Sequence, residues 1–144
     1  MKRIVIDSSV LIKWLAPEDD SEAALRFVEP VWEGHAPDFL LTEVANVAWK
    51  KVRRGELDSN ARAERFLEEA SRTDLAFHPS EPLLAPALRI ALATGRTVYD
   101  SLYLALADQL GTYLVTADRK LFTALQGGAY ARLVAWFEDD PFPT

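Results

Sequence analysis

The sequence predicts a three-layer α/β/α fold in which helices cover a central, mostly parallel sheet. Short strand-like runs alternate with longer segments of helical period, which is the pattern of parallel strands joined by helical crossovers. Two of the runs are apolar nearly throughout, as expected of strands buried on both faces. With 144 residues the chain has the usual size of one domain, and we expect a single domain over residues 1–144.

Four strands are expected where apolar and β-branched residues gather. They cover residues 3–7, 75–78, 112–116 and 132–136 and read RIVID, LAFH, TYLVT and RLVAW. The first and third are the apolar runs and belong at the centre of the sheet. The last residues, 139–144, are expected to form a frayed tail.

The segments between these strands have helical period. Helices are expected over residues 9–15, 21–33, 39–55, 58–72, 81–95, 99–111 and 118–128. The second contains Pro30, where a kink or break is allowed. The third closes on Gly55, a common C-terminal stop, and the fourth has Asp58 or Ser59 as its N-cap.

The composition excludes several classes of protein. Hydrophobic residues make up 49% and charged residues 26% of the chain, which is typical of a globular domain. The chain has no cysteine, and its two histidines lack the spacing of a zinc site, so any metal must be bound by oxygen. No apolar run is long enough to span a membrane or to act as a secretory leader, and we expect a cytoplasmic protein without membrane contact.

The net charge of -6 argues against a domain that binds nucleic acid through its overall charge. Residues 50–65 differ from the rest, because Lys50, Lys51, Arg53, Arg54, Arg62 and Arg65 outnumber the acids there. This segment is either a solvated helical face or a contact for an anionic partner.

Three aspartates are placed where parallel strands are expected to end. Asp7 ends the first strand, Asp118 follows the strand over residues 112–116, and Asp100 opens the helix over residues 99–111. Chemistry collects at the carboxyl ends of parallel strands, and we expect all three acids at equivalent positions on that edge. Each alone could also be a helix cap.

A fourth acid, Glu43, lies among apolar residues in the expected helix over residues 39–55. Helical period places it on a stripe with Asn46 and Lys50, which could face either solvent or a site. If the four acids meet in one crevice, their mutual repulsion calls for a divalent cation, and oxygen ligands favour Mg²⁺ or Mn²⁺. This composition indicates metal-assisted phosphoryl chemistry.

Four segments together resemble the PIN-domain ribonucleases of the VapC toxin type. They are VIDSSVLIKWL, APDFLLTEVANVAW, TVYDSLYLALA and LVTADRKL, and they follow one another in the family's order over nearly the whole chain. The resemblance implies a PIN-like fold and an endoribonuclease that uses one or two Mg²⁺ or Mn²⁺ ions. It also implies the toxin of a type II toxin-antitoxin system, commonly a homodimer, that is held inactive by a VapB-like antitoxin.

The resemblance also assigns the site residues. It implies that Asp7 and Asp100 hold the principal metal, that Asp118 binds it directly or through water, and that Glu43 completes the shell or positions the attacking water. Thr116 matches the hydroxyl residue beside the last acid, where it orients a carboxylate or a water.

The resemblance implies two possible roles for the basic end of the helix that carries Glu43. Lys50, Arg53 and Arg54 either contact the RNA backbone or belong to the dimer or antitoxin surface. The sequence does not indicate which RNA is cut.

The alternatives to a nuclease are a receiver-like signalling domain and a non-catalytic binding module. A magnesium-binding receiver-like signalling domain needs an adjacent acidic pair and a lysine at a later strand end, and neither RIVIDSSV nor TYLVTAD supplies them. A non-catalytic PIN-fold binding module would be expected to lack at least one acid. All four acids are present.

Overall fold

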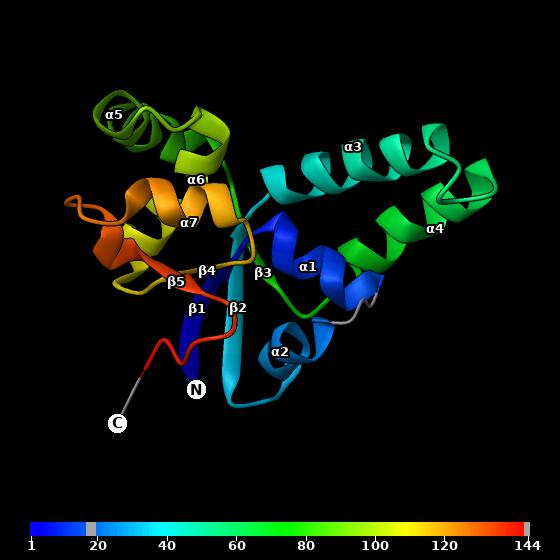
Figure 1. Ribbon diagram of the computed structural model, residues 1–144, viewed down its shortest axis with the longest axis horizontal. Helices are drawn as coiled ribbons and strands as arrows, with labels where there is room; N and C mark the ends of the chain where they lie inside the picture. Colours follow the sequence, from blue (N-terminus) through cyan, green and yellow to red (C-terminus); the bar gives the residue numbers. More distant parts are fainter. Residues whose placement is uncertain (17–19, 143–144) are drawn as a thin grey trace.

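Within residues 1–16 and 20–142, which the computed structural model describes, five parallel strands form one sheet (Figure 1). The strands are β1 (Lys2–Ile6), β2 (Trp32–Pro37), β3 (Ala76–His78), β4 (Leu114–Thr116) and β5 (Val134–Trp136). Their order is β3-β2-β1-β4-β5, so the chain reverses its direction of winding between β1 and β4. In an open parallel sheet this switch point is where a crevice forms outside the carboxyl ends of the strands.

Helices flank the sheet on two sides, as the three-layer prediction requires. They are α1 (Ser8–Leu15), α2 (Ser21–Leu25), α3 (Phe39–Arg53), α4 (Asn60–Ser71), α5 (Leu84–Thr94), α6 (Val98–Leu110) and α7 (Arg119–Leu125). Figure 1 shows α1, α3 and α4 together on one side of the molecule and α5, α6 and α7 on the other. Among the described residues no helix combines the length and apolarity that crossing a membrane requires.

The core is built around β1 and α6. Ile4, Val5 and Ile6 of β1 are fully inaccessible to solvent, as expected for the middle strand of a sheet covered on both faces. Every residue of α6 from Ser101 to Ala107 is buried, which explains why that segment is apolar almost all round. A rigid central strand and a buried helix therefore support the ends that carry Asp7 and Asp100.

The predicted helix over residues 21–33 is wrong in its second half. Helix α2 ends at Leu25, a single 3₁₀ turn follows over Arg26–Val28, and Glu29 is extended with ψ 148° because it precedes Pro30. The missed strand β2 then runs between β1 and β3. Its sequence, WEGHAP, contains glycine and proline, which are poor strand formers, so local preference did not indicate a strand.

The other predicted elements are confirmed, with ends shifted by up to three residues. Ser59 rather than Asp58 caps α4, since its hydroxyl accepts a hydrogen bond from the backbone N–H of Arg62 at 3.2 Å. Part of the expected frayed tail is packed, because the ring of Phe142 lies 5.9 Å from Trp32 and 5.4 Å from Tyr113. Residues 143 and 144 lie outside the described residues.

The hydroxyl of Ser101, buried in α6, makes no hydrogen bond within the described part of the chain. We expect Ser101→Ala to raise the free energy of unfolding by about 1 kcal/mol, because an unpaired buried polar group is removed and alanine has the higher helix propensity. Urea denaturation measures this change. Thr112→Val is the matched control and should lower stability, since the Thr112 hydroxyl donates to the Arg3 carbonyl at 2.5 Å. A destabilised Ser101→Ala protein would contradict the expectation.

Candidate active site

Asp7 lies directly after β1 and caps α1. Its Oδ1 accepts hydrogen bonds from the Ser9 hydroxyl at 2.5 Å and from the Val10 N–H at 3.3 Å, and its Oδ2 accepts one from the Thr116 hydroxyl at 2.5 Å. The side chain is buried, and burial raises its pKa from 3.8 to about 6 although all three hydrogen bonds act in the opposite direction. Desolvation therefore outweighs hydrogen bonding at this carboxylate.

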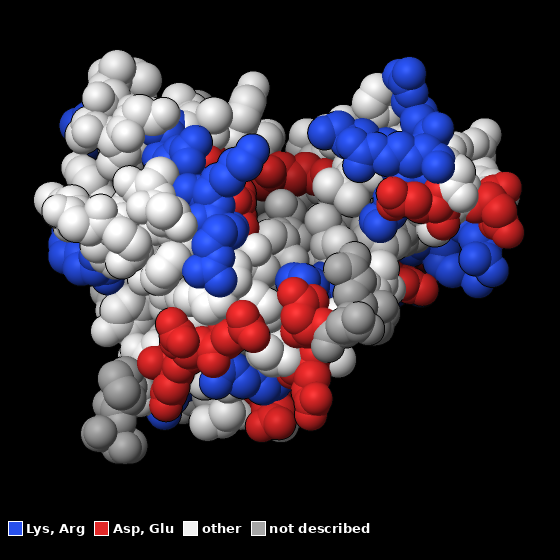
Figure 2. Space-filling view, viewed as in Figure 1, with Lys and Arg blue, Asp and Glu red and all other residues white. Residues whose placement is uncertain are grey.

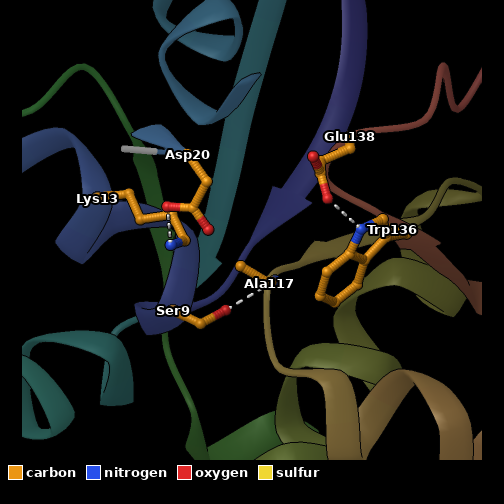
Figure 3. Close-up of polar contacts among 6 residues, drawn as sticks. All are labelled: Ser9, Lys13, Asp20, Ala117, Trp136 and Glu138. Carbon is orange, nitrogen blue, oxygen red and sulfur yellow. Dashed lines mark hydrogen bonds and ion pairs between the residues drawn. The ribbon is translucent and has the colours of Figure 1, made fainter. Parts of the chain in front are cut away.

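Thr116 and Ser9 join the loop after β4 to the loop after β1. The fully buried Thr116 hydroxyl accepts a hydrogen bond from the backbone N–H of Asp118 at 3.0 Å, and the Ser9 hydroxyl accepts one from Ala117 N–H at 2.9 Å (Figure 3). The two neighbouring strand ends are thus held in one register. Thr116 was predicted as a site residue, whereas Ser9 was not, because a serine directly after a strand-end aspartate is also typical of a helix cap.

Asp118 caps α7 and faces the other acids at the same time. Its Oδ1 accepts hydrogen bonds from the N–H groups of Lys120 at 3.0 Å and Leu121 at 3.2 Å. Its negative charge raises the pKa of Asp7, Glu43 and Asp100. Capping and participation in the acidic cluster are therefore compatible.

Glu43 lies near the start of α3 and contacts α6. The hydroxyl of Tyr103, a residue only 2% exposed, donates a hydrogen bond to the Glu43 carboxylate. Burial, followed by repulsion from Asp7, Asp100 and Asp118, raises the pKa of Glu43 to about 7. Tyr103 was not predicted as a site residue, although its position three residues after Asp100 places both on one helical face.

Asp100 reaches the cluster by a different route from the one predicted. Helix α6 follows α5 through a short turn and not a strand, so the expected equivalence of Asp100 with the two strand-end aspartates is wrong. The Thr97 hydroxyl caps α6 by accepting from the Asp100 N–H at 3.0 Å. Burial and then the charge of Asp118 raise the pKa of Asp100, while Arg96 acts in the opposite direction.

The acids lie in a hollow between the two helical groups. Figure 2 shows acidic side chains at the bottom of a depression between the α3–α4 side and the α5–α7 side, with basic side chains on both sides of it. Besides burial, the charges of Asp7, Asp100 and Asp118 raise the pKa of Glu43, and the charge of Asp118 raises that of Asp100. Because such effects weaken with distance, they agree with this placement. The structure thus brings Asp7, Glu43, Asp100 and Asp118 together.

The chemistry of this donor set suits a hard divalent cation. The ligand atoms are carboxylate oxygens, and burial together with like charge disfavours the ionised forms of Asp7, Glu43 and Asp100, which a bound cation would offset. As placed, no three acid or histidine side chains in the described residues are arranged to hold one ion together. The residue types therefore fit a divalent metal ion. In this structure the acids are neighbours, but their hydrogen bonds do not place them as ligands of one ion.

The basic residues predicted to contact RNA are exposed at the far end of α3. They are Lys50, Arg53 and Arg54. Lys50 is seven residues beyond Glu43, about 10 Å along the helix axis. The guanidinium of Arg53 lies 4.9 Å from the centre of the exposed Trp49 ring. Two other cations of the segment are paired, since Lys51 contacts Glu56 at 3.2 Å and Arg62 contacts Asp58 at 3.3 Å.

The raised pKa of Glu43 predicts a pH-dependent gain of stability in Glu43→Gln. The folded pKa of about 7 exceeds the ordinary 4.5, so the wild-type protein loses stability as pH rises between these values. Without metal, we expect Glu43→Gln to be more stable than wild type by about 1–2 kcal/mol at pH ~8, after allowance for solvent screening, and nearly equal at pH ~5. Glutamine can still accept the Tyr103 hydrogen bond.

Urea denaturation in EDTA at both pH values measures the effect. Glu69→Gln on the exposed surface of α4 is the control and should differ little from wild type at either pH. A Glu43→Gln protein that is less stable than wild type at pH ~8 would show that the carboxylate stabilises the fold.

Comparison with known proteins agrees with the fold. The family model described as "PIN domain" matches residues 4–127. The chain is 40% identical over 121 residues to Ribonuclease VapC3 of Pyrobaculum aerophilum, covering 83% of this chain and 92% of that protein. The crystal structure of PAE2754 from the same organism superposes with TM-score 0.66 and 28% identity, covering 88% of this chain and 82% of that chain. A chain of a toxin-antitoxin complex from Klebsiella pneumoniae has the same fold, with TM-score 0.65 and 16% identity over 98% of this chain and 99% of its own. The protein therefore belongs to the PIN-domain family.

Proposed function

We propose that the protein is a metal-dependent endoribonuclease that acts in the cytoplasm as the toxin of a type II toxin-antitoxin system. The observation that carries the proposal is the proximity of Asp7, Glu43, Asp100 and Asp118, whose charges act on one another beside the switch point of the sheet. The 40% identity to a protein named as a ribonuclease supports RNA as the substrate. One cluster of buried residues from Ile4 to Phe137 supports a single domain.

The resemblance to the PIN nucleases gives each acid a role. Asp7 and Asp100 would hold the principal ion, Asp118 would contribute directly or through water, and Glu43 would complete the shell or position the attacking water. One or two bound Mg²⁺ or Mn²⁺ ions would supply an acidified water and offset charge on the phosphate oxygens. The products are expected to carry a 5'-phosphate and a 3'-hydroxyl.

Neutral side chains keep the acids in place before metal and substrate arrive. Thr116 and Ser9 hold both oxygens of Asp7, and Tyr103 holds Glu43 against α6. Metal binding needs ionised carboxylates, and the pKa values of Asp7 and Glu43 are raised to about 6 and about 7. Cation binding therefore releases protons from the protein near neutral pH.

The partners follow from the surface and from the relatives. Lys50, Arg53 and Arg54 contact the RNA backbone beyond Glu43. A VapB-like antitoxin is the inhibitory partner, in keeping with the toxin-antitoxin complex that shares this fold. A homodimer fits the leucines on the outer face of α5, since Leu84, Leu88 and Leu92 recur at helical spacing and are 47%, 50% and 78% exposed.

The purified protein is expected to cut RNA with Mg²⁺ or Mn²⁺ and to lose this activity in EDTA. Asp7→Asn or Asp100→Asn should lower the rate by at least about 100-fold, because each removes a negative oxygen from the metal site. A circular RNA substrate tests internal cleavage, and labelling of the new ends identifies the 5'-phosphate.

Asp108→Asn supplies the matched control for this assay. Asp108 lies on the same helix as Asp100, is exposed and pairs with Arg132 at 3.3 Å, so the same substitution there should leave the rate within about twofold of wild type. Undiminished cleavage by Asp7→Asn and Asp100→Asn proteins would rule out the assigned site.

Expression of the chain alone is expected to stop bacterial growth, because uncontrolled RNA cleavage removes functional RNA. The Asp100→Asn version should be harmless, and co-expression of a short gene encoded directly upstream should restore growth to the wild-type strain. Colony counts after induction measure both effects. Equal toxicity of the wild-type and Asp100→Asn chains would contradict the toxin mechanism proposed here.

A further inference from the structure

A second group of basic residues lies on the α5–α7 side of the hollow. Arg96 is in the turn between α5 and α6, and Arg119 and Lys120 are in the first turn of α7. Figure 2 shows basic side chains on this side of the hollow, across the acids from those near the end of α3. The three residues, named here the α7 rim, have no part in the function proposed above.

Arg96 is fixed beside the acids. Its backbone N–H donates to the Thr94 hydroxyl at 3.1 Å, and its guanidinium Nη1 donates to the Lys120 carbonyl at 3.3 Å, which ties the α5–α6 turn to α7. Its positive charge lowers the pKa of Asp100 against the effect of burial, so the guanidinium lies within electrostatic reach of that acid. A guanidinium has five N–H donors, and most of those of Arg96 remain for another acceptor.

Arg119 is held in place by an aromatic ring. Its guanidinium lies 3.8 Å from the centre of the Trp136 ring, and the indole N–H of Trp136 donates to Glu138 at 2.9 Å (Figure 3). A cation stacked on a ring keeps its N–H edges free to bind an anion. Arg119 is therefore oriented without being neutralised.

Within the parts of the chain that the structure describes, no α7-rim side chain has an acidic partner within 4.0 Å. Arg132, on the same side of the sheet, pairs with Asp108 at 3.3 Å. A cluster of unpaired cations beside buried acids fits a site for a polyanion, because a phosphate chain must approach four carboxylates that repel it.

We propose that the α7 rim binds the RNA backbone, so that the strand crosses the acids between two basic surfaces, the α7 rim and the end of α3. This inference rests on the proposed nuclease function and names a part of the substrate site. Phosphate contacts on both sides of the scissile bond offset repulsion by the acids and fix the direction of the strand.

Two double variants with the same net charge test the proposal. Arg96→Ala/Lys120→Ala removes two cations of the rim, and Lys2→Ala/Arg3→Ala removes two exposed cations at the opposite end of β1 from Asp7. Both are made in the Asp7→Asn protein, so that a fluorescent single-stranded RNA stays intact during anisotropy titrations at several salt concentrations. Thermal unfolding confirms that each variant is folded.

The rim variant should bind RNA about tenfold more weakly near 0.1 M salt, and the slope of log K against log salt should fall by about 0.7 for each lost phosphate contact. The control should bind as the Asp7→Asn parent does. Arg96→Lys, which keeps the charge, should retain the salt slope of the parent.

Equal RNA binding by the rim and control variants would overturn the inference. The same holds if the rim variant binds RNA normally but loses binding of polyglutamate, because the rim would then contact an acidic protein. Failure of the nuclease function is recognised separately, since the wild-type protein would then leave RNA uncut with Mg²⁺ whatever the binding results. Wild-type cleavage with unchanged binding by the rim variant would remove this inference alone.

Discussion

The contact between Asp7 and Thr116 is the interaction on which the acidic site depends. It joins the ends of β1 and β4, the two neighbouring strands at which the sheet changes its direction of winding. Val5 and Ile6 pair with Leu114 and Val115, which fixes the register and brings the two strand ends level. With Ser9 bridging to Ala117, the hydrogen bonds leave Asp7 little freedom to turn away from the hollow.

Holding Asp7 in this position costs stability in the absence of a cation. The rise of its pKa from 3.8 to about 6 corresponds to about 3 kcal/mol of disfavoured ionisation. That is a substantial part of the 5–15 kcal/mol by which a domain of this size is ordinarily stable. The buried strand β1 and the buried helix α6 supply the rigidity against which such a site can persist. Carboxylates whose ionisation is disfavoured in this way are typical of sites that bind a ligand.

Helices α3 and α6 complete the cluster from opposite sides of the molecule. The Tyr103 hydroxyl reaches Glu43 across the gap between them, and one turn toward the start of both helices the rings of Phe39 and Tyr99 stack at 5.0 Å. These two contacts set the distance between the acid on α3 and the acid on α6. The same arrangement places acidic side chains in the hollow and basic side chains on either side of it (Figure 2).

The sequence by itself determined the alternation of strands and helices and the glycines that end α3, α5 and α6, and it predicted the four acids of the proposed site. Those features depend on local periodicity and on residue type, which a single chain displays directly. Only the tertiary structure decided that WEGHAP is a strand, because β2 is stabilised by its pairing with β1 and β3 and not by its own residues. The same holds for the route of Asp100 into the site, for the roles of Tyr103 and Ser9, and for the contact of Arg96 with Lys120. Each of these joins segments far apart along the chain, and such contacts arise from packing, which local sequence preference does not encode.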